Sequence, residues 1–214
     1  MSAHIAIEGT IGAGKSTLVD SLSKILREKE IKCKVIQEPV HQWMCYGQNR
    51  DNLLEKMYSD PKQWAFKFQL AALVTKCNGL TLNRNINILT ERCIGAQSNV
   101  FIPILYEDDN LTNLEKTILE DYINFLEKNV EECTPNVMIY IKVSPEKALD
   151  RIKQRGRQEE EKITIEYLER LEEKYESWMS NTTDIIKLDG NDPDNLDPNF
   201  VYQLIRNKLE NPKH

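Results

Sequence analysis

Short apolar runs of strand length alternate along the chain with longer segments of helical periodicity. Five such runs, each containing Ile or Val, lie at residues 4–9, 32–38, 86–91, 136–143 and 184–190. Runs of this length and composition are typical of strands that are buried on both faces. Strands that alternate with helices predict a parallel sheet with helices on both sides. We therefore expect an α/β fold with a five-stranded parallel sheet.

Helical patterns occupy the segments between the predicted strands. Helices are expected at residues 16–30 and 165–179, and residues 63–82 should form a helix with apolar residues on most of its faces. Because strands of a parallel sheet present their carboxyl ends at one edge, the residues that follow each strand are the candidates for chemistry.

Two further helices are predicted from an apolar stripe and from end signals. The first is amphipathic, with a stripe that consists of Leu114, Ile118, Tyr122 and Phe125. In the second, Ser144 and Pro145 supply an N-cap and a first-turn residue. Gly156 should end that helix, because glycine readily adopts the left-handed conformation found at helix ends.

The composition places the chain among ordinary globular proteins and excludes several functional classes. Its 214 residues are 40% apolar and 29% charged, which predicts a single domain over residues 1–214. No apolar run approaches the roughly 18 residues of a spanning helix, and the first residues resemble neither a signal nor a transit peptide, so a cytoplasmic location is expected. The net charge of -6 argues against a nucleic-acid partner, which would require a basic surface.

The first predicted strand is followed by a phosphate-binding motif. Residues 9–16 read GTIGAGKS and match G-x-x-x-x-G-K-[ST], with a strand before and a helix after. The backbone N–H groups of such a loop converge on phosphate oxygens, its lysine neutralises the outer phosphates, and its serine can bind Mg²⁺. We expect the phosphates of ATP to contact Gly9, Thr10, Ile11, Gly12, Ala13, Gly14, Lys15, Ser16 and Thr17.

Charged residues follow the second and third predicted strands. Glu38 precedes Pro39 at the end of the second strand, where it could take the proton from an acceptor hydroxyl or could be an ordinary solvated carboxylate. Glu91 and Arg92 end the third strand. Glu91 could bind Mg²⁺ opposite Ser16, and Arg92 could stabilise charge on a transferred phosphoryl group. The guanine motif N-K-x-D of GTPases does not occur in the sequence.

A basic segment, DRIKQRGRQEEE, covers residues 150–161. Arg151 and Arg155 lie four residues apart and should share one helix face, while Gly156 lets Arg157 turn toward the same space. A solvated helix face is the simpler interpretation. In a protein with a phosphate-binding loop, three arginines around a helix end instead suggest a lid over residues 151–162 that closes on phosphates and excludes water.

These motifs together resemble those of the deoxyribonucleoside kinases, the family that includes deoxycytidine, deoxyguanosine and mitochondrial thymidine kinases. GTIGAGKS, EPVHQW, MYSDPKQWAFKFQ, TERC, RIKQRGRQEEE and IEYLERLEEKYESW follow one another in the family's order, between about residues 3 and 192. The resemblance implies a P-loop kinase that transfers the γ-phosphate of ATP, with Mg²⁺, to the 5′-hydroxyl of a deoxynucleoside. It also implies a homodimer packed through helices.

The resemblance assigns roles by position. Glu38 would be the base on the 5′-hydroxyl with Arg92 beside it and Lys15 at the phosphates, while Ser16 and Glu91 would hold Mg²⁺. Tyr58 and Glu160 would bind the sugar 3′-hydroxyl. Asp189 and Asn191 lie in the DGNDPD loop, which would contact adenine. The remaining residues around the deoxynucleoside would be Ile11, Val40, Trp43, Leu54, Met57, Phe68, Gln69, Ala72, Lys76, Gln97 and Phe101.

Two positions depart from the family pattern, and both bear on base specificity. Position 76 is Lys where cytidine and purine enzymes have Arg, and position 97 is Gln where they have Asp. An Arg and Asp pair leaves no room for the methyl group of thymine. The departures therefore predict broad acceptance of pyrimidines. A nucleoside monophosphate kinase, or a nucleotide-binding regulator without catalysis, would share the P-loop and remains an alternative at this point.

Overall fold

The computed structural model describes residues 3–80, 86–183 and 185–210, and its centre is a five-stranded sheet. The strand order is β2-β3-β1-β4-β5, and every neighbouring pair is parallel. This arrangement confirms the predicted α/β fold. Of the predicted segments, Asp184, Thr81 and Leu82 lie outside the described residues. The strands are β1 (His4–Glu8), β2 (Cys33–Ile36), β3 (Asn87–Glu91), β4 (Val137–Lys142) and β5 (Ile185–Asp189).

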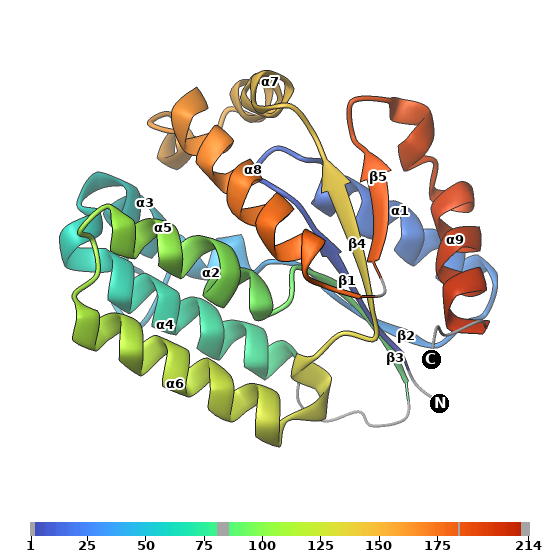
Figure 1. Ribbon diagram of the computed structural model, residues 1–214, viewed down its shortest axis with the longest axis horizontal. Helices are drawn as coiled ribbons and strands as arrows, with labels where there is room; N and C mark the ends of the chain where they lie inside the picture. Colours follow the sequence, from blue (N-terminus) through green and yellow to red (C-terminus); the bar gives the residue numbers. More distant parts are fainter. Residues whose placement is uncertain (1–2, 81–85, 184, 211–214) are drawn as a thin grey trace.

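Helices cover both faces of the sheet (Figure 1). One face carries α1 (Lys15–Glu28) and α9 (Pro198–Glu210), which contact each other and the strands. The opposite face carries α4 (Pro61–Leu80), α6 (Asn113–Asn129) and α8 (Ile165–Ser180). With both faces covered, the central strands can be apolar throughout, and Ala6, Ile7, Ile139 and Tyr140 are fully buried.

The short elements were not predicted from the sequence, and neither was α9. Among these short elements are α2 (Val40–Trp43) and α3 (Leu53–Ser59), whereas the predicted helix that Gly156 ends is α7 (Pro145–Arg155). A π-helical turn at Gln97–Phe101 leads into α5 (Ile102–Glu107). Elements of four to seven residues contain too few turns to have a recognisable periodicity. The remaining short turns are 3₁₀ helices at Glu131–Cys133, Gln158–Glu160 and Pro193–Leu196.

The end signals of α7 are confirmed. The hydroxyl of Ser144 accepts a hydrogen bond from the Lys147 N–H, and Pro145 is the first helical residue. Gly156 ends the helix in the left-handed conformation, with φ of 67°. The last helical residue is thus Arg155, and Gly156 and Arg157 separate it from the 3₁₀ turn that begins at Gln158.

The amphipathic helix predicted around Leu114, Ile118, Tyr122 and Phe125 is present as α6, but most of that apolar stripe is exposed. The buried face of α6 consists of Leu119, Ile123 and Leu126, which pack in a cluster with residues of α4 and α5. Leu114 is instead 69% exposed and Phe125 57% exposed. Both faces have apolar residues at helical spacing, so periodicity alone could not decide which one faces the core.

Nowhere in the described ranges is a helix both long and apolar enough to span a bilayer.

Candidate active site

The phosphate-binding loop connects β1 to α1 and depends on close backbone packing. Gly12 has φ of 79°, and a Cβ atom there would lie 2.4 Å from the carbonyl oxygen of Ala148 in α7. Only glycine fits both the conformation and the contact. Gly14, at φ of 97°, is the N-cap of α1, so the loop directs the N-terminus of that helix toward the space above the sheet.

Lys15 is the first residue of α1 and is buried, with 4% of its surface exposed. Its ammonium group donates a hydrogen bond of 2.6 Å to the carbonyl oxygen of Thr10. Burial lowers the pKa of Lys15 to about 7, and the nearby positive charge of Arg92 acts in the same direction. An anion beside this ammonium group would oppose both effects, so the site favours phosphate.

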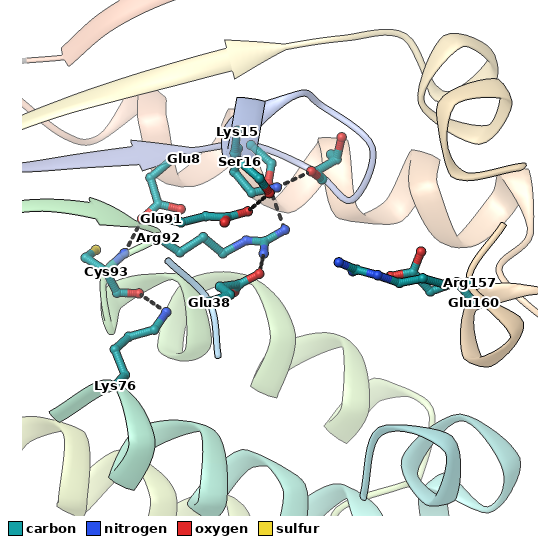
Figure 2. A network of polar contacts seen from close by, with 12 residues as sticks. Glu8, Lys15, Ser16, Glu38, Lys76, Glu91, Arg92, Cys93, Arg157 and Glu160 are labelled. Atoms are coloured by element: carbon teal, nitrogen blue, oxygen red, sulfur yellow. Dashed lines mark hydrogen bonds and ion pairs between the residues drawn. The ribbon is translucent and has the colours of Figure 1, made fainter. Parts of the chain in front are cut away.

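Ser16 and Glu91 lie opposite each other, from the start of α1 and the end of β3. The Ser16 hydroxyl donates a 2.8 Å hydrogen bond to a carboxylate oxygen of Glu91 (Figure 2). Mg²⁺ prefers oxygen ligands and usually takes only one or two from the protein, with waters and substrate phosphates completing the octahedron. The hydroxyl and the carboxylate fit such a site.

Arg92 and Glu38 form an ion pair at the carboxyl edge of the sheet. The Nη1 atom of Arg92 lies 2.5 Å from Oε2 of Glu38, and the exposed fractions of the two side chains are 5% and 16% (Figure 2). Burial favours the neutral form of Glu38, but the positive charges of Arg92, Lys76 and Lys15 outweigh it and lower the pKa to about 2. Glu38 is therefore ionised at neutral pH.

The three arginines of the predicted lid lie around the C-terminal end of α7 but have different partners. Arg151 donates to the carbonyl oxygens of Ala13, at 3.2 Å, and Gly190, at 2.9 Å. Arg155 and Arg157 both pair with the buried carboxylate of Glu160, at 2.5 and 3.2 Å. The residue predicted to bind a sugar hydroxyl thus holds two arginines at the mouth of the site.

A cleft of about 600 Å³ lies above the phosphate-binding loop. Predicted residues that line it are Ile11, Gly12, Gly14, Lys15, Ser16, Thr17, Glu38, Val40, Glu91, Arg92, Arg151, Arg155 and Arg157. Residues that the sequence reasoning missed also line it, among them Gln37, His41, Gln154 and Leu196. Asp189 and Asn191 do not line the cleft. Asn191 accepts a hydrogen bond from the Ser144 N–H, so their loop is tied to the start of α7.

A second, smaller cavity of about 90 Å³ lies beside the cleft, between the sheet edge and helices α3 and α4. Ile11, Glu38 and Arg92 line both cavities, which therefore meet at the ion pair. The predicted residues that line the second cavity are Ile11, Glu38, Trp43, Leu54, Met57, Tyr58, Phe68, Gln69, Ala72, Lys76, Arg92, Gln97 and Phe101. Ala96, Leu105 and Tyr167 complete it and were not predicted.

Two of the residues predicted to surround the deoxynucleoside, Val40 and Glu160, do not line the second cavity. Val40 lines the phosphate cleft, and Glu160 lines neither cavity. Glu160 nevertheless lies close to Tyr58. Burial raises the pKa of Tyr58 well above its usual range, and the negative charge of Glu160 contributes to the shift.

Three polar side chains end at the far side of the second cavity. Gln97 donates a 3.1 Å hydrogen bond from its amide nitrogen to the side-chain oxygen of Gln69. The amide oxygen of Gln97 is buried and has no hydrogen-bond partner among the described residues. The ammonium group of Lys76 lies 3.4 Å from the carbonyl oxygen of Cys93. This end of the cavity therefore offers a free acceptor and flexible donors.

Glu8 and Tyr175 are buried polar residues behind Arg92 that the sequence reasoning did not connect with the site. Glu8 ends β1 immediately before the phosphate-binding loop, and Tyr175 is in α8. The Nε atom of Arg92 donates to the Tyr175 hydroxyl at 3.0 Å. The sequence contained one signal for Glu8, which is a charged residue at the end of an apolar strand, directly before the phosphate-binding loop. Tyr175 gave no such signal, because its spacing is that of an ordinary core residue.

Comparisons with known proteins agree with this geometry. Residues 5–210 match the family model described as deoxynucleoside kinase. Deoxycytidine kinase of Bos taurus is 33% identical over 201 residues, which cover 84% of this chain and 76% of the relative, and the Homo sapiens deoxycytidine kinase is 32% identical over the same shares. A protein of Invertebrate iridescent virus 3 that is named as a kinase is 33% identical and covers 94% of this chain and 95% of its own. The chain belongs to the deoxynucleoside kinase family.

Proposed function

We propose that this kinase transfers the γ-phosphate of ATP to the 5′-hydroxyl of a deoxyribonucleoside and accepts both thymidine and deoxycytidine. The observation that carries the proposal is the pair of adjoining cavities that share Glu38 and Arg92. The larger cavity has the cations that a triphosphate needs. The smaller one has mostly apolar walls with a few polar groups, as expected for a neutral nucleoside.

Glu38 would accept the proton of the 5′-hydroxyl. A pKa of about 2 makes its carboxylate a weak base in the resting site. This weakness is tolerable because phosphoryl transfer passes through a loose transition state, in which positioning of the hydroxyl matters more than early removal of its proton. Glu38 would therefore act first by orienting the hydroxyl toward the phosphate, while Arg92 stabilises negative charge on the transferred group.

Lys15 and the loop N–H groups would bind the phosphates of ATP, and Arg151, Arg155 and Arg157 would form the lid. The hydrogen bond from Lys15 to Thr10 and the ion pairs of Arg155 and Arg157 with Glu160 occupy donors that phosphate oxygens would take over. Mg²⁺, held by Ser16 and Glu91, would neutralise charge on the phosphates. Closure of the lid would leave Glu160 free to join Tyr58 at the sugar 3′-hydroxyl.

The amide pair Gln69 and Gln97 supports acceptance of both pyrimidines. Cytosine presents an amino donor where thymine presents a carbonyl acceptor, and an amide can serve either one after rotating by 180°. The oxygen of Gln97 has no hydrogen-bond partner among the described residues, so it could accept from the cytosine amino group, and the flipped amide could donate to thymine. Ala72, also in the cavity wall, leaves room near the base.

The apolar side chains that α6 leaves exposed, Leu114, Ile118 and Phe125, support the proposal of a homodimer, whereas Tyr122 is half-buried against the cluster with α4 and α5. Leu114 and Phe125 are more than half exposed, and Ile118 is 44% exposed. An apolar stripe on a helix is self-complementary in a two-fold arrangement, in which the same face of both copies is buried. The same arrangement would explain why α6 has apolar residues on two opposite sides.

Substitution Glu38→Gln should keep ATP binding and lower kcat by roughly 10²-fold, because the amide cannot accept the hydroxyl proton. Steady-state kinetics and ATP titration of the two proteins measure the two effects. Glu120→Gln, on the solvent side of α6, is the matched control and should behave like wild type. A Glu38→Gln enzyme with near-normal turnover would remove Glu38 from the mechanism.

Substitution Arg155→Ala should lower kcat about tenfold or more, since the transferred phosphate loses a charged donor. Lys153→Ala provides the control, because Lys153 is an exposed cation on the same helix and does not line the cleft. Rates at saturating ATP and deoxynucleoside compare the two variants. Equal effects of both substitutions would indicate a general loss of positive charge and argue against a lid.

A panel of the four deoxynucleosides with ATP should show turnover of thymidine and deoxycytidine within about tenfold of each other. The double variant Lys76→Arg and Gln97→Asp should lose thymidine turnover by tenfold or more while it keeps deoxycytidine turnover, because the rigid pair fills the space of the thymine methyl. Turnover of purine deoxynucleosides alone would refute the proposed specificity.

Substitution of Leu114 and Phe125 by Glu should convert the dimer to a monomer, since four charged side chains would meet in the buried interface of the two copies. Sedimentation equilibrium at micromolar concentration measures the change in mass. The matched control replaces Val35 and Phe200, which are exposed on other elements, by Glu. A wild-type protein that sediments as a monomer at these concentrations would contradict the homodimer.

A further inference from the structure

Arg92 has a backbone conformation that non-glycine residues rarely adopt. Its φ is 58°, in the left-handed region. Such a conformation costs free energy and persists only where surrounding contacts fix it. The cost is relevant to function because Arg92 is the residue at which the two cavities meet.

The contacts that fix Arg92 come from four directions. Its backbone N–H donates to the carbonyl oxygen of Ile7 at 3.0 Å. In the side chain, Nη2 donates to the carbonyl oxygen of Gly9 at 3.1 Å, and Nη1 pairs with Glu38. The remaining guanidinium nitrogen, Nε, donates to the hydroxyl of Tyr175 at 3.0 Å. All three guanidinium nitrogens are thus engaged, and only the contact with Glu38 belongs to the proposed reaction.

The Tyr175 hydroxyl links Arg92 to Glu8 by two hydrogen bonds. It accepts from Arg92 and donates its own proton to Oε2 of Glu8 at 3.2 Å. The other oxygen of Glu8 accepts the N–H of Cys93 at 2.7 Å (Figure 2). Glu8 therefore fixes the Arg92 segment in two ways. It accepts the N–H of the next residue, Cys93, and it is linked to the Arg92 side chain through the Tyr175 hydroxyl. Both Glu8 and Tyr175 have 0% of their surface exposed.

Burial of a carboxylate and a phenol costs free energy, which their hydrogen bonds offset only in part. Burial raises the pKa of Glu8, while the Cys93 N–H and the positive charges of Lys76 and Arg92 counteract the shift. An apolar pair of the same shape could fill the core without this cost. Neither side chain lines the phosphate cleft or the second cavity, so neither would touch a substrate.

We infer that Glu8 and Tyr175 are positioning residues that hold the Arg92 guanidinium, and through it the Glu38 carboxylate, in the geometry required for phosphoryl transfer. The inference rests on the proposed roles of Glu38 and Arg92. The chain of contacts runs from the end of β1 through α8 to the end of β3. It therefore couples the catalytic ion pair to a helix that otherwise packs in the core.

Substitution Tyr175→Phe removes one hydroxyl and leaves the ring in the core. We expect kcat to fall about tenfold, while the KM values for ATP and for the deoxynucleoside stay within about twofold, because the substrate contacts themselves are intact. Tyr140→Phe is the matched control. The Tyr140 ring is buried and stacks on that of Tyr175, with centroids 5.7 Å apart, but its hydroxyl has no hydrogen-bond partner among the described residues. This control should keep the wild-type kcat.

The same substitution in the Glu38→Gln background distinguishes positioning from general destabilisation. If Tyr175 acts through Arg92 on Glu38, Tyr175→Phe should lower the residual kcat of Glu38→Gln by clearly less than the tenfold expected in the wild-type enzyme, because only the contact of Arg92 with the transferred phosphate is left to be disturbed. Glu8→Gln, whose single amide oxygen cannot accept from both Tyr175 and Cys93, should give the same pattern and replaces Tyr175→Phe if that variant does not fold. Thermal unfolding of each variant checks the fold.

The outcomes separate this inference from the proposed function. A wild-type rate for Tyr175→Phe and Glu8→Gln, or a tenfold loss that is equally large in the Glu38→Gln background, would overturn the positioning role. Near-normal turnover of Glu38→Gln would instead overturn the proposed function. The inference is supported if Tyr175→Phe lowers kcat more in the enzyme that has Glu38 than in Glu38→Gln, while the KM values and the Tyr140→Phe control stay unchanged.

Discussion

The ion pair between Arg92 and Glu38 is the interaction on which the site depends. It joins the ends of β3 and β2 in a place where both side chains are largely removed from water. A buried charge is costly when it loses its partner, so each of the two residues constrains the other. The pair also marks the boundary between the phosphate cleft and the second cavity, because both residues line both spaces.

The sheet order makes this pair possible. In the order β2-β3-β1, the ends of three parallel strands lie next to one another at one edge. Glu38 follows the first of these strands, Arg92 the second, and the Gly9 carbonyl that accepts from Arg92 follows the third. Residues that are about fifty positions apart in the chain therefore become immediate neighbours. A different strand order would separate them, whatever their sequence.

The charges around the ion pair are arranged so that substrate can replace internal partners. Lys15 donates to a backbone carbonyl, and Arg155 and Arg157 pair with Glu160. Lys15 is buried, whereas about a third of each arginine side chain is exposed, but all three donors are already oriented by their partners. In the second cavity the polar groups are the amides of Gln69 and Gln97 and the ammonium group of Lys76, which can rotate or move. The cleft above the phosphate-binding loop is thus more strictly determined than the far side of the second cavity.

The sequence by itself determined the elements whose signals are local. Gly9, Gly14, Lys15 and Ser16 identified the phosphate-binding loop, Ser144 and Gly156 identified both ends of α7, and apolar runs identified all five strands. Residues placed directly after a strand, such as Glu38, Glu91 and Arg92, could be assigned to one edge, because parallel strands share their carboxyl end. Short helices such as α2 and α3 could not be predicted, since they contain too few turns for a periodicity.

Only the tertiary structure decided questions that depend on what lies opposite a residue. Leu114 and Leu119 have the same chemistry on one helix, and the packing of α4 and α5 alone determines that Leu119 is the buried one. Glu160 pairs with Arg155 and Arg157, and Tyr175 contacts Arg92 from a helix more than eighty residues away. A hydrogen bond or a buried face needs two surfaces, and a sequence pattern describes only one of them.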